Sequence, residues 1–158
     1  MRDNIGLFRG KRKDTLEWVE GYYVHIPCGR LSRDEHLIQT VKDNGQIGQL
    51  YEVIPETVGE YTGLTDKNGK NGKKIFEGDI LHLKAGDGWT CPKGTDVYYK
   101  VVFTEFNEEW NSTTEYIGFM AENEYGSLSS IDYHIREHGA TVIGNIHDNS
   151  ELLKGGVE

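Results

Sequence analysis

The amino-acid sequence predicts a mainly β domain, built as a small SH3-like barrel or as two sheets, with one short helix near the C-terminus. Twenty of the 158 residues are glycine and only three are proline. Much of the glycine falls between short runs rich in Val, Ile, Tyr, Phe and Trp, which is the pattern of strands joined by turns. Several of these runs alternate between apolar and polar residues, as half-buried strands do.

The N-terminal segment predicts an antiparallel pair of strands. Residues 5–10, IGLFRG, form the first strand, residues 11–15 form the turn, and residues 16–26 form the second strand. The second strand has one mostly apolar parity, which we expect to face the core. This parity consists of Leu16, Trp18, Glu20, Tyr22, Val24 and Ile26.

Further strands follow along the chain. HLIQTV (residues 36–41) and QLYEVI (residues 49–54) flank a turn in which Asn44-Gly45 supplies the positive φ angles of a hairpin. A second polar turn, in residues 65–73, separates EYTGL from KIFEGDIL. DVYYKVVFTEF, TEYIGFMAE and ATVIGNIHD complete about seven to nine predicted strands.

One internal helix is predicted in SLSSIDYHIREHG, residues 127–139. Leu128, Ile131 and Ile135 recur at helical spacing, serines precede them as caps, and Gly139 follows where a left-handed C-terminal cap belongs. The residues NSELLKGG add one short turn near the C-terminus. Because 158 residues suffice for one core, we predict a single domain over residues 1–158.

The stretch KKIFEGDIL places Glu77, Gly78 and Asp79 between two apolar pairs. Glycine adopts backbone angles that other residues avoid, and an aspartate side chain accepts hydrogen bonds from nearby backbone N–H groups. We therefore expect a bulge or sharp bend at these three residues, from which the apolar pairs enter the core in two directions. The two acids are interpreted as structural rather than catalytic.

Two long motifs resemble the YopX family, small proteins found in bacteriophages and prophages. They are ETVGEYTGLTDKNGKNGKKIFEGDIL, residues 56–81, and VIGNIHDNSELL, residues 142–153. The N-terminal LFRGKRKDTLEWVEGYYV, residues 7–24, is similar to the family's opening hairpin, so the resemblance spans nearly the whole chain. It implies a phage or prophage gene product with a mostly β fold, and it brings no established activity.

The net charge, the hydropathy and the cysteine content indicate where the protein is located and which partners it is expected to bind. The formal net charge of −9 disfavours general attraction to phosphate backbones or to anionic lipid. No stretch approaches the about 18 to 20 apolar residues of a membrane span, and the N-terminus lacks the apolar region of a signal peptide. Cys28 and Cys91 match no metal spacing and are interpreted as thiols in a reducing compartment, with a single disulfide as the alternative. We expect a cytoplasmic protein of a bacterial host cell with no membrane partner.

The string HIREH, from His134 to His138, fits the H-x-x-E-H pattern of inverted zinc peptidases. Such a site needs a third ligand, Gly139 ends the predicted helix at once, and short strings recur by chance. We interpret the string as a solvated helix face and predict no catalytic residue, no metal ligand and no cofactor. A zinc hydrolase is kept as a distant alternative.

Two turns are rich in Lys and Arg. If both lay at one end of a barrel they would form a basic patch able to contact phosphates. Lysine-rich turns are more often only solvated, so a nucleic-acid-binding module that uses turns 9–13 and 67–74 is the alternative function. The candidate phosphate contacts are Arg9, Lys11, Arg12, Lys13, Lys67, Lys70, Lys73 and Lys74.

The function favoured by the sequence is a phage or prophage accessory protein that acts as a non-enzymatic interaction or self-associating module. A small β-rich domain with one substantial helix cannot cover every sheet edge, and an unpaired edge is a template for pairing. The expected partner is a second copy of the chain, or a phage or host protein. Nucleic acid is disfavoured by the net charge.

Overall fold

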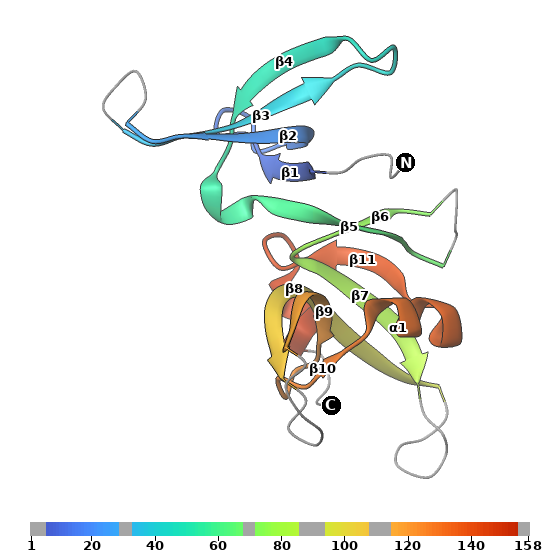
Figure 1. The fold of residues 1–158 in the computed structure, drawn as a ribbon. Coiled ribbons are helices and arrows are strands. Elements are labelled where there is room, and N and C mark those ends of the chain that lie inside the picture. Colours follow the sequence, from blue (N-terminus) through green and yellow to red (C-terminus); the bar gives the residue numbers. More distant parts are fainter. Residues whose placement is uncertain (1–5, 29–32, 68–71, 86–93, 108–114, 155–158) are drawn as a thin grey trace. The chain divides into compact units, whose positions relative to one another are not determined.

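The computed structural model describes residues 6–28, 33–67, 72–85, 94–107 and 115–154 (Figure 1). The chain divides into two compact units, residues 1–63 and residues 64–158. The single domain predicted over residues 1–158 stays a prediction, because a division into compact units does not test whether they fold together.

The first unit contains most of an antiparallel six-stranded sheet, of which the last strand, β6 (Lys74–Phe76), belongs to the second unit. Strand β5 crosses the boundary after Gly63 and ends in the second unit. The order of the sheet is β4-β3-β2-β1-β5-β6. Its elements are β1 (Leu7–Lys11), β2 (Trp18–Ile26), β3 (Glu35–Val41), β4 (Ile47–Glu52), the 3-10 turn Pro55–Thr57, β5 (Gly59–Thr65) and β6 (Lys74–Phe76).

The two N-terminal hairpins form where the sequence predicts them. Strand β1 pairs with β2, with Leu7 opposite Tyr22, and β3 pairs with β4, with Gln39 opposite Leu50. The turn between β3 and β4 contains Gly45 at a φ of 79°. A glycine is favoured there because a left-handed backbone strains any residue with a Cβ atom.

The prediction of which face of β2 is buried was wrong. Tyr22, Val24 and Ile26 are 48%, 39% and 40% exposed, and Leu16 lies in the preceding turn at a φ of 63°. The opposite face carries Ile38 and Val53, which are fully buried, whereas on the Tyr22 face only Leu37, the cross-strand partner of Val24, is as little as 9% exposed among the described apolar residues of β2, β3 and β4. Alternation in a sequence separates the two faces of a strand, but it does not say which face the rest of the chain covers.

The second unit contains an antiparallel sheet of five strands in the order β10-β9-β8-β7-β11. The core of the second unit combines residues from strands with one residue of the helix. The cluster of buried side chains is Ile75, Leu81, Val101, Ala121 and Ile131. The strands are β7 (Asp79–Ala85), β8 (Thr95–Asn107), β9 (Glu115–Glu122), β10 (Leu128–Ser129) and β11 (Thr141–Asn145).

The predicted helix is present as α1, Ile131–His138, but the assignment of Leu128 to its apolar repeat was wrong, because Leu128 lies in strand β10. Ser130 is its N-cap and accepts a hydrogen bond from the backbone N–H of Tyr133, which satisfies one of the unpaired donors of the first turn. Gly139 ends the helix in the left-handed conformation at a φ of 61°. A 3-10 turn, Ser150–Lys154, lies near the C-terminus, where the sequence predicts one turn.

The mainly β fold with two sheets and one short helix is therefore confirmed, and the sheets do not close into a barrel (Figure 1). The described residues contain eleven strands, more than the predicted seven to nine. The surplus includes β10, which has two residues and is too short to leave a periodic signal, whereas β6 and β7 are the two strand segments of KIFEGDIL that the predicted bend separates. Among the helices in the described ranges, none has the length and apolar character needed to cross a bilayer.

Candidate functional site

The stretch from Glu77 to Asp79 forms a tight turn between β6 and β7. Gly78 has a φ of 80°, and its backbone N–H donates to the carbonyl of Val101 at 2.9 Å. The Asp79 side chain is 1% exposed and accepts a hydrogen bond from the backbone N–H of Phe76 at 2.8 Å. These bonds lie within the second unit and agree with a structural role for Asp79, while the role predicted for Glu77 stays a prediction.

In the first basic turn, the described cations contact acids or aromatic rings. Arg12 forms two hydrogen bonds with Asp14, at 2.9 and 2.6 Å, and stacks over Tyr51. Lys13 pairs with Glu52 at 2.6 Å. Arg9 and Lys11 each lie over the ring of Trp18, at 4.8 and 5.5 Å from its centroid. A phosphate would have to replace these contacts, so they do not support the phosphate interpretation.

The second basic turn belongs to the second unit. Lys67 is exposed, and Lys73 is exposed with its Nζ atom 3.3 Å from the carbonyl oxygen of Val142. Lys74 is partly buried, and Lys70 lies outside the described residues. The phosphate contacts predicted from both turns stay predictions, because the two turns lie in different units.

The histidines of HIREH differ in their surroundings, and the interpretation of the string as a solvated helix face was wrong for His134. His134 is 6% exposed, packs against the ring of Tyr99 at 4.3 Å, and shares a 2.6 Å hydrogen bond with Ser129 Oγ. Burial, and then the nearby His138, lower the pKa of His134. His138 is exposed, with its ring centroid 6.0 Å from that of His134. Within the described ranges, no third metal-ligating side chain completes a site with this pair.

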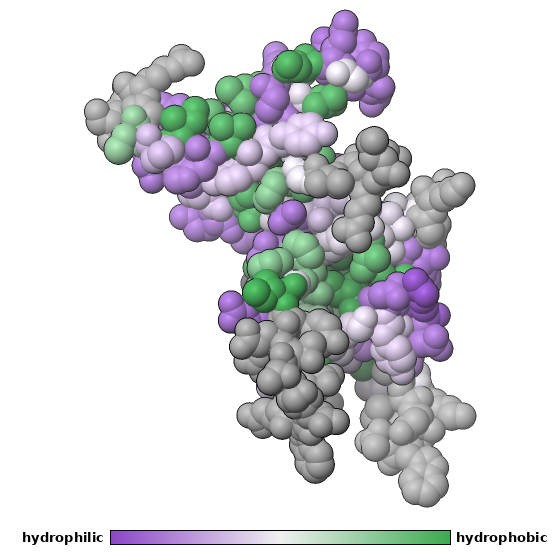
Figure 2. All heavy atoms as spheres, in the orientation of Figure 1, coloured by the Kyte–Doolittle hydropathy of each residue, from purple (hydrophilic) through white to green (hydrophobic). Residues whose placement is uncertain are grey.

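An open apolar face lies on the first unit. The strand register places large apolar side chains of β2, β3 and β4 on the same side of the sheet, opposite the side that carries Ile38 and Val53. Figure 2 shows hydrophobic side chains at the surface of this unit. The open apolar face consists of Tyr22, Val24, Ile26, Val41, Ile47 and Leu50, which are 39% to 76% exposed.

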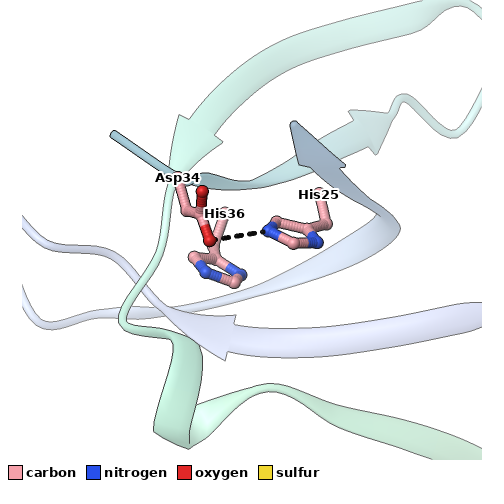
Figure 3. A group of neighbouring side chains, drawn as sticks. All are labelled: His25, Asp34 and His36. Carbon is pink, nitrogen blue, oxygen red and sulfur yellow. Dashed lines mark ion pairs between the residues drawn. The ribbon is translucent and has the colours of Figure 1, made fainter. Parts of the chain in front are cut away.

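A cluster of two imidazoles and one carboxylate lies on the other side of the same sheet (Figure 3). His25 and His36 are direct cross-strand partners on β2 and β3, and their rings stack at 4.5 Å with an interplanar angle of 8°. Asp34 immediately precedes β3, and its Oδ2 atom is 3.5 Å from Nε2 of His25. The ligand atoms of all three lie within 4.8 Å of one another.

Two neighbours hold the cluster in place. The Tyr23 hydroxyl is hydrogen-bonded to Nδ1 of His36 at 2.5 Å. The backbone N–H of Cys28 donates to Oδ1 of Asp34 at 3.2 Å. This hydrogen bond, followed by that from His25, lowers the pKa of Asp34. Cys28 itself is an exposed free thiol, and Cys91 lies outside the described residues.

The second unit has a cavity of about 310 Å³ beside β8 and the turn after β9. Its charged lining residues are Asp96 and Glu124, and Asp96 is bonded to Nε2 of His82 at 2.7 Å. This hydrogen bond lowers the pKa of Asp96. The described lining contains no Lys, Arg, Cys or His, and its hydroxyl groups are those of Thr95, Tyr98 and Tyr125.

The sequence did not predict the imidazole and carboxylate cluster. His25, Asp34 and His36 follow no compact ligand spacing, and only the pairing of β2 with β3 brings them together. One signal was available in the sequence: His25 and His36 lie at the facing ends of two predicted strands, so a hairpin between those strands would have placed them opposite each other.

Comparisons with known proteins agree with the fold. The family model described as "YopX protein" matches residues 7–154. The crystal structure of protein EF1440 from Enterococcus faecalis is similar to the chain, with 23% identity and a TM-score of 0.50, over 96% of this chain and 99% of that one. At that identity the likeness concerns the fold alone. A search of curated proteins finds no match.

Proposed function

This chain belongs to the YopX family, and we propose that it is a non-enzymatic interaction module whose first unit associates with a second copy of itself. In this proposal two copies pack their open apolar faces against each other. Sheets pack face to face at about 10 Å, with their inner side chains interdigitated. A two-fold axis lets the same surface serve both copies.

The observation that carries the proposal is the open apolar face. Six large apolar side chains lie together on one side of a single sheet and keep 39% to 76% of their surface exposed. Contiguous apolar patches of this kind on proteins mark interaction surfaces. Burial of the exposed part of each side chain stabilises the dimer by on the order of 1 kcal/mol. Two copies bury twelve such side chains, and their summed contribution is comparable to the free energy of about 4–15 kcal/mol that association costs.

The charge distribution favours a second copy at this unit. Residues 1–63 contain eight Lys and Arg against ten Asp and Glu, a net charge of −2, whereas residues 64–158 contain nine against sixteen, a net charge of −7. Two copies of a chain with a charge of −9 repel each other. Most of that negative charge belongs to residues 64–158, whereas the proposed interface belongs to residues 1–63.

The setting proposed for this module comes from the family. We place it in the cytoplasm of a bacterial host, as an accessory protein of a phage or prophage. Thiols are kept reduced in that compartment, which agrees with the free thiol of Cys28. A phage or host protein is the other class of partner for the same apolar face.

Static light scattering over a range of micromolar protein concentrations tests the proposal. We expect the mass to rise on concentration from the chain mass of 17.9 kDa towards twice that value. Because the proposed contact between the two copies is apolar, we expect association to persist in moderate salt, which screens interactions between charges. A mass that stays at 17.9 kDa over the whole range would overturn self-association and direct the interpretation to an unlike partner.

A further inference from the structure

We propose that His25, Asp34 and His36 form a binding site for a late first-row divalent transition metal, with Zn²⁺ as its natural representative. The three side chains lie at one end of the β2–β3 pair, on the face opposite the open apolar face (Figure 3). Metal binding is therefore independent of the association proposed above, and the two can fail separately.

The donor set selects the class of metal. Two imidazole nitrogens and one carboxylate oxygen suit zinc, nickel, copper and cobalt, whereas magnesium and calcium prefer sites made of oxygen alone. Three protein ligands leave a coordination position open for water or for a group from another molecule. The exposure of His25 and Asp34 gives an ion direct access from solvent.

The backbone fixes two of the three ligands. His25 and His36 are opposite each other in the β2–β3 register, so their Cβ atoms are held at the separation of a cross-strand pair. Ligands carried by paired strands keep their spacing better than ligands carried by loops. Asp34 lies at the start of β3, and its second carboxylate oxygen is anchored by the backbone N–H of Cys28.

Tyr23 selects the nitrogen of His36 that faces the ion. Its hydroxyl occupies Nδ1 of His36 at 2.5 Å, so Nε2 is the nitrogen left for a metal. With a metal on Nε2, the proton resides on Nδ1 and is donated to the Tyr23 oxygen. Such an outer partner fixes the tautomer and the orientation of a ligating histidine.

The distances require only a small adjustment. Bonds of about 2.0–2.1 Å in tetrahedral geometry place zinc ligands roughly 3.3 Å apart. The 3.5 Å between Nε2 of His25 and Oδ2 of Asp34 already agrees with that spacing. The ligand atoms of all three residues lie within 4.8 Å of one another, and the side chains of His25 and Asp34 are exposed, so that a change of rotamer can bring them closer.

The competing interpretation is a surface ion pair beside stacked rings. An exposed ion pair stabilises a protein by about 0–1 kcal/mol and creates no affinity for metal. The two interpretations differ in one measurable property, because only the metal site binds one equivalent of Zn²⁺ through these three side chains.

Calorimetric titration of Zn²⁺ into the metal-free chain of 158 residues tests the site. Both cysteines are first replaced by Ser, in Cys28→Ser and Cys91→Ser, so that a thiol cannot be the ligand. We expect one equivalent to bind, and His25→Ala to weaken binding at least tenfold. His25 is 42% exposed, so its removal leaves the fold intact. Tyr23→Phe should weaken binding by roughly tenfold through the tautomer of His36.

His82→Ala is the matched control, because it removes a histidine that faces a single aspartate, Asp96, without a third ligand. We expect it to bind Zn²⁺ as the parent does. The proposal is overturned if the parent binds less than half an equivalent, if His25→Ala binds unchanged, or if His82→Ala loses binding to the same extent. Competition by millimolar Mg²⁺ would also overturn it, because that would identify an oxygen site.

Discussion

The carboxylate of Asp79 accepts a hydrogen bond of 2.8 Å from the backbone N–H of Phe76, and both residues are at least 98% buried. The bond spans the turn between β6 and β7. Gly78, at the centre of the turn, donates its N–H to Val101 and accepts from the N–H of Ile146. The turn therefore links the start of β7 with β8 and with the segment after β11.

Replacement of Asp79 by Ala should destabilise the chain by about 1–3 kcal/mol, because a buried backbone N–H loses its acceptor. Asp79→Asn retains a carbonyl oxygen at the same place and should cost less. Urea unfolding of the two variants beside the wild type measures the difference. Equal stability of Asp79→Ala and the wild type would refute a structural role for this carboxylate.

Gly78→Ala should cost about 1–2 kcal/mol, because a residue with a Cβ atom is strained at a φ of 80°. Space is not the obstacle, since an added Cβ would lie 3.5 Å from Ile146 at an ordinary contact distance. Gly118→Ala in β9 is the matched control, because its Cβ meets nothing within 4 Å and its φ is not positive. Thermal denaturation of both variants should show a lower midpoint for Gly78→Ala alone.

The stability of the chain should fall as the pH decreases below about 6.5, in part through His134. Burial lowers the pKa of His134 in the folded chain, so the unfolded chain takes up the proton first. The stabilising difference is complete above the unfolded pKa of 6.5 and is lost as the pH falls towards the lower folded value. The slope from one such group is at most about 1.4 kcal/mol per pH unit.

His134→Gln isolates that contribution. The variant should have a smaller dependence of unfolding free energy on pH between pH 6.5 and 5 than the wild type. Denaturant unfolding at a series of pH values measures both slopes. Parallel slopes in the two proteins would show that His134 titrates alike in the folded and unfolded states.

Local signals in the sequence were sufficient for the longer strands, the turns and the helix caps of this fold. The glycine of the β3–β4 turn, the Ser130 cap and the Gly139 cap act through neighbours within a few residues, so residue type alone predicts them. The whole-chain resemblance predicted the family, which the match over residues 7–154 confirms.

The remaining features depend on partners distant in the sequence. Tyr22 and Val24 carry the alternation of a buried strand, yet the core forms on the other face through Ile38 and Val53. The sequence of residues 16–26 alone does not indicate which face of β2 is buried. His25 likewise gains its neighbours from the register of β2 with β3 and not from any spacing along the chain.

The central claim is that the open apolar face of the first unit is where two copies meet, and Val24→Lys tests it most directly. Val24 lies on β2, inside the sheet and two strands from the edge strand β4. A lysine there opposes face-to-face packing without blocking strand pairing along that edge. Ile117→Lys, at a 63% exposed apolar residue of the second unit, is the matched control.

Sedimentation equilibrium of the three proteins at the same micromolar concentrations gives the decisive comparison. We predict that Val24→Lys sediments as a single chain of 17.9 kDa, whereas the wild type and Ile117→Lys associate alike. Association of Val24→Lys as strong as that of the wild type would contradict the claim and assign the contact to another surface.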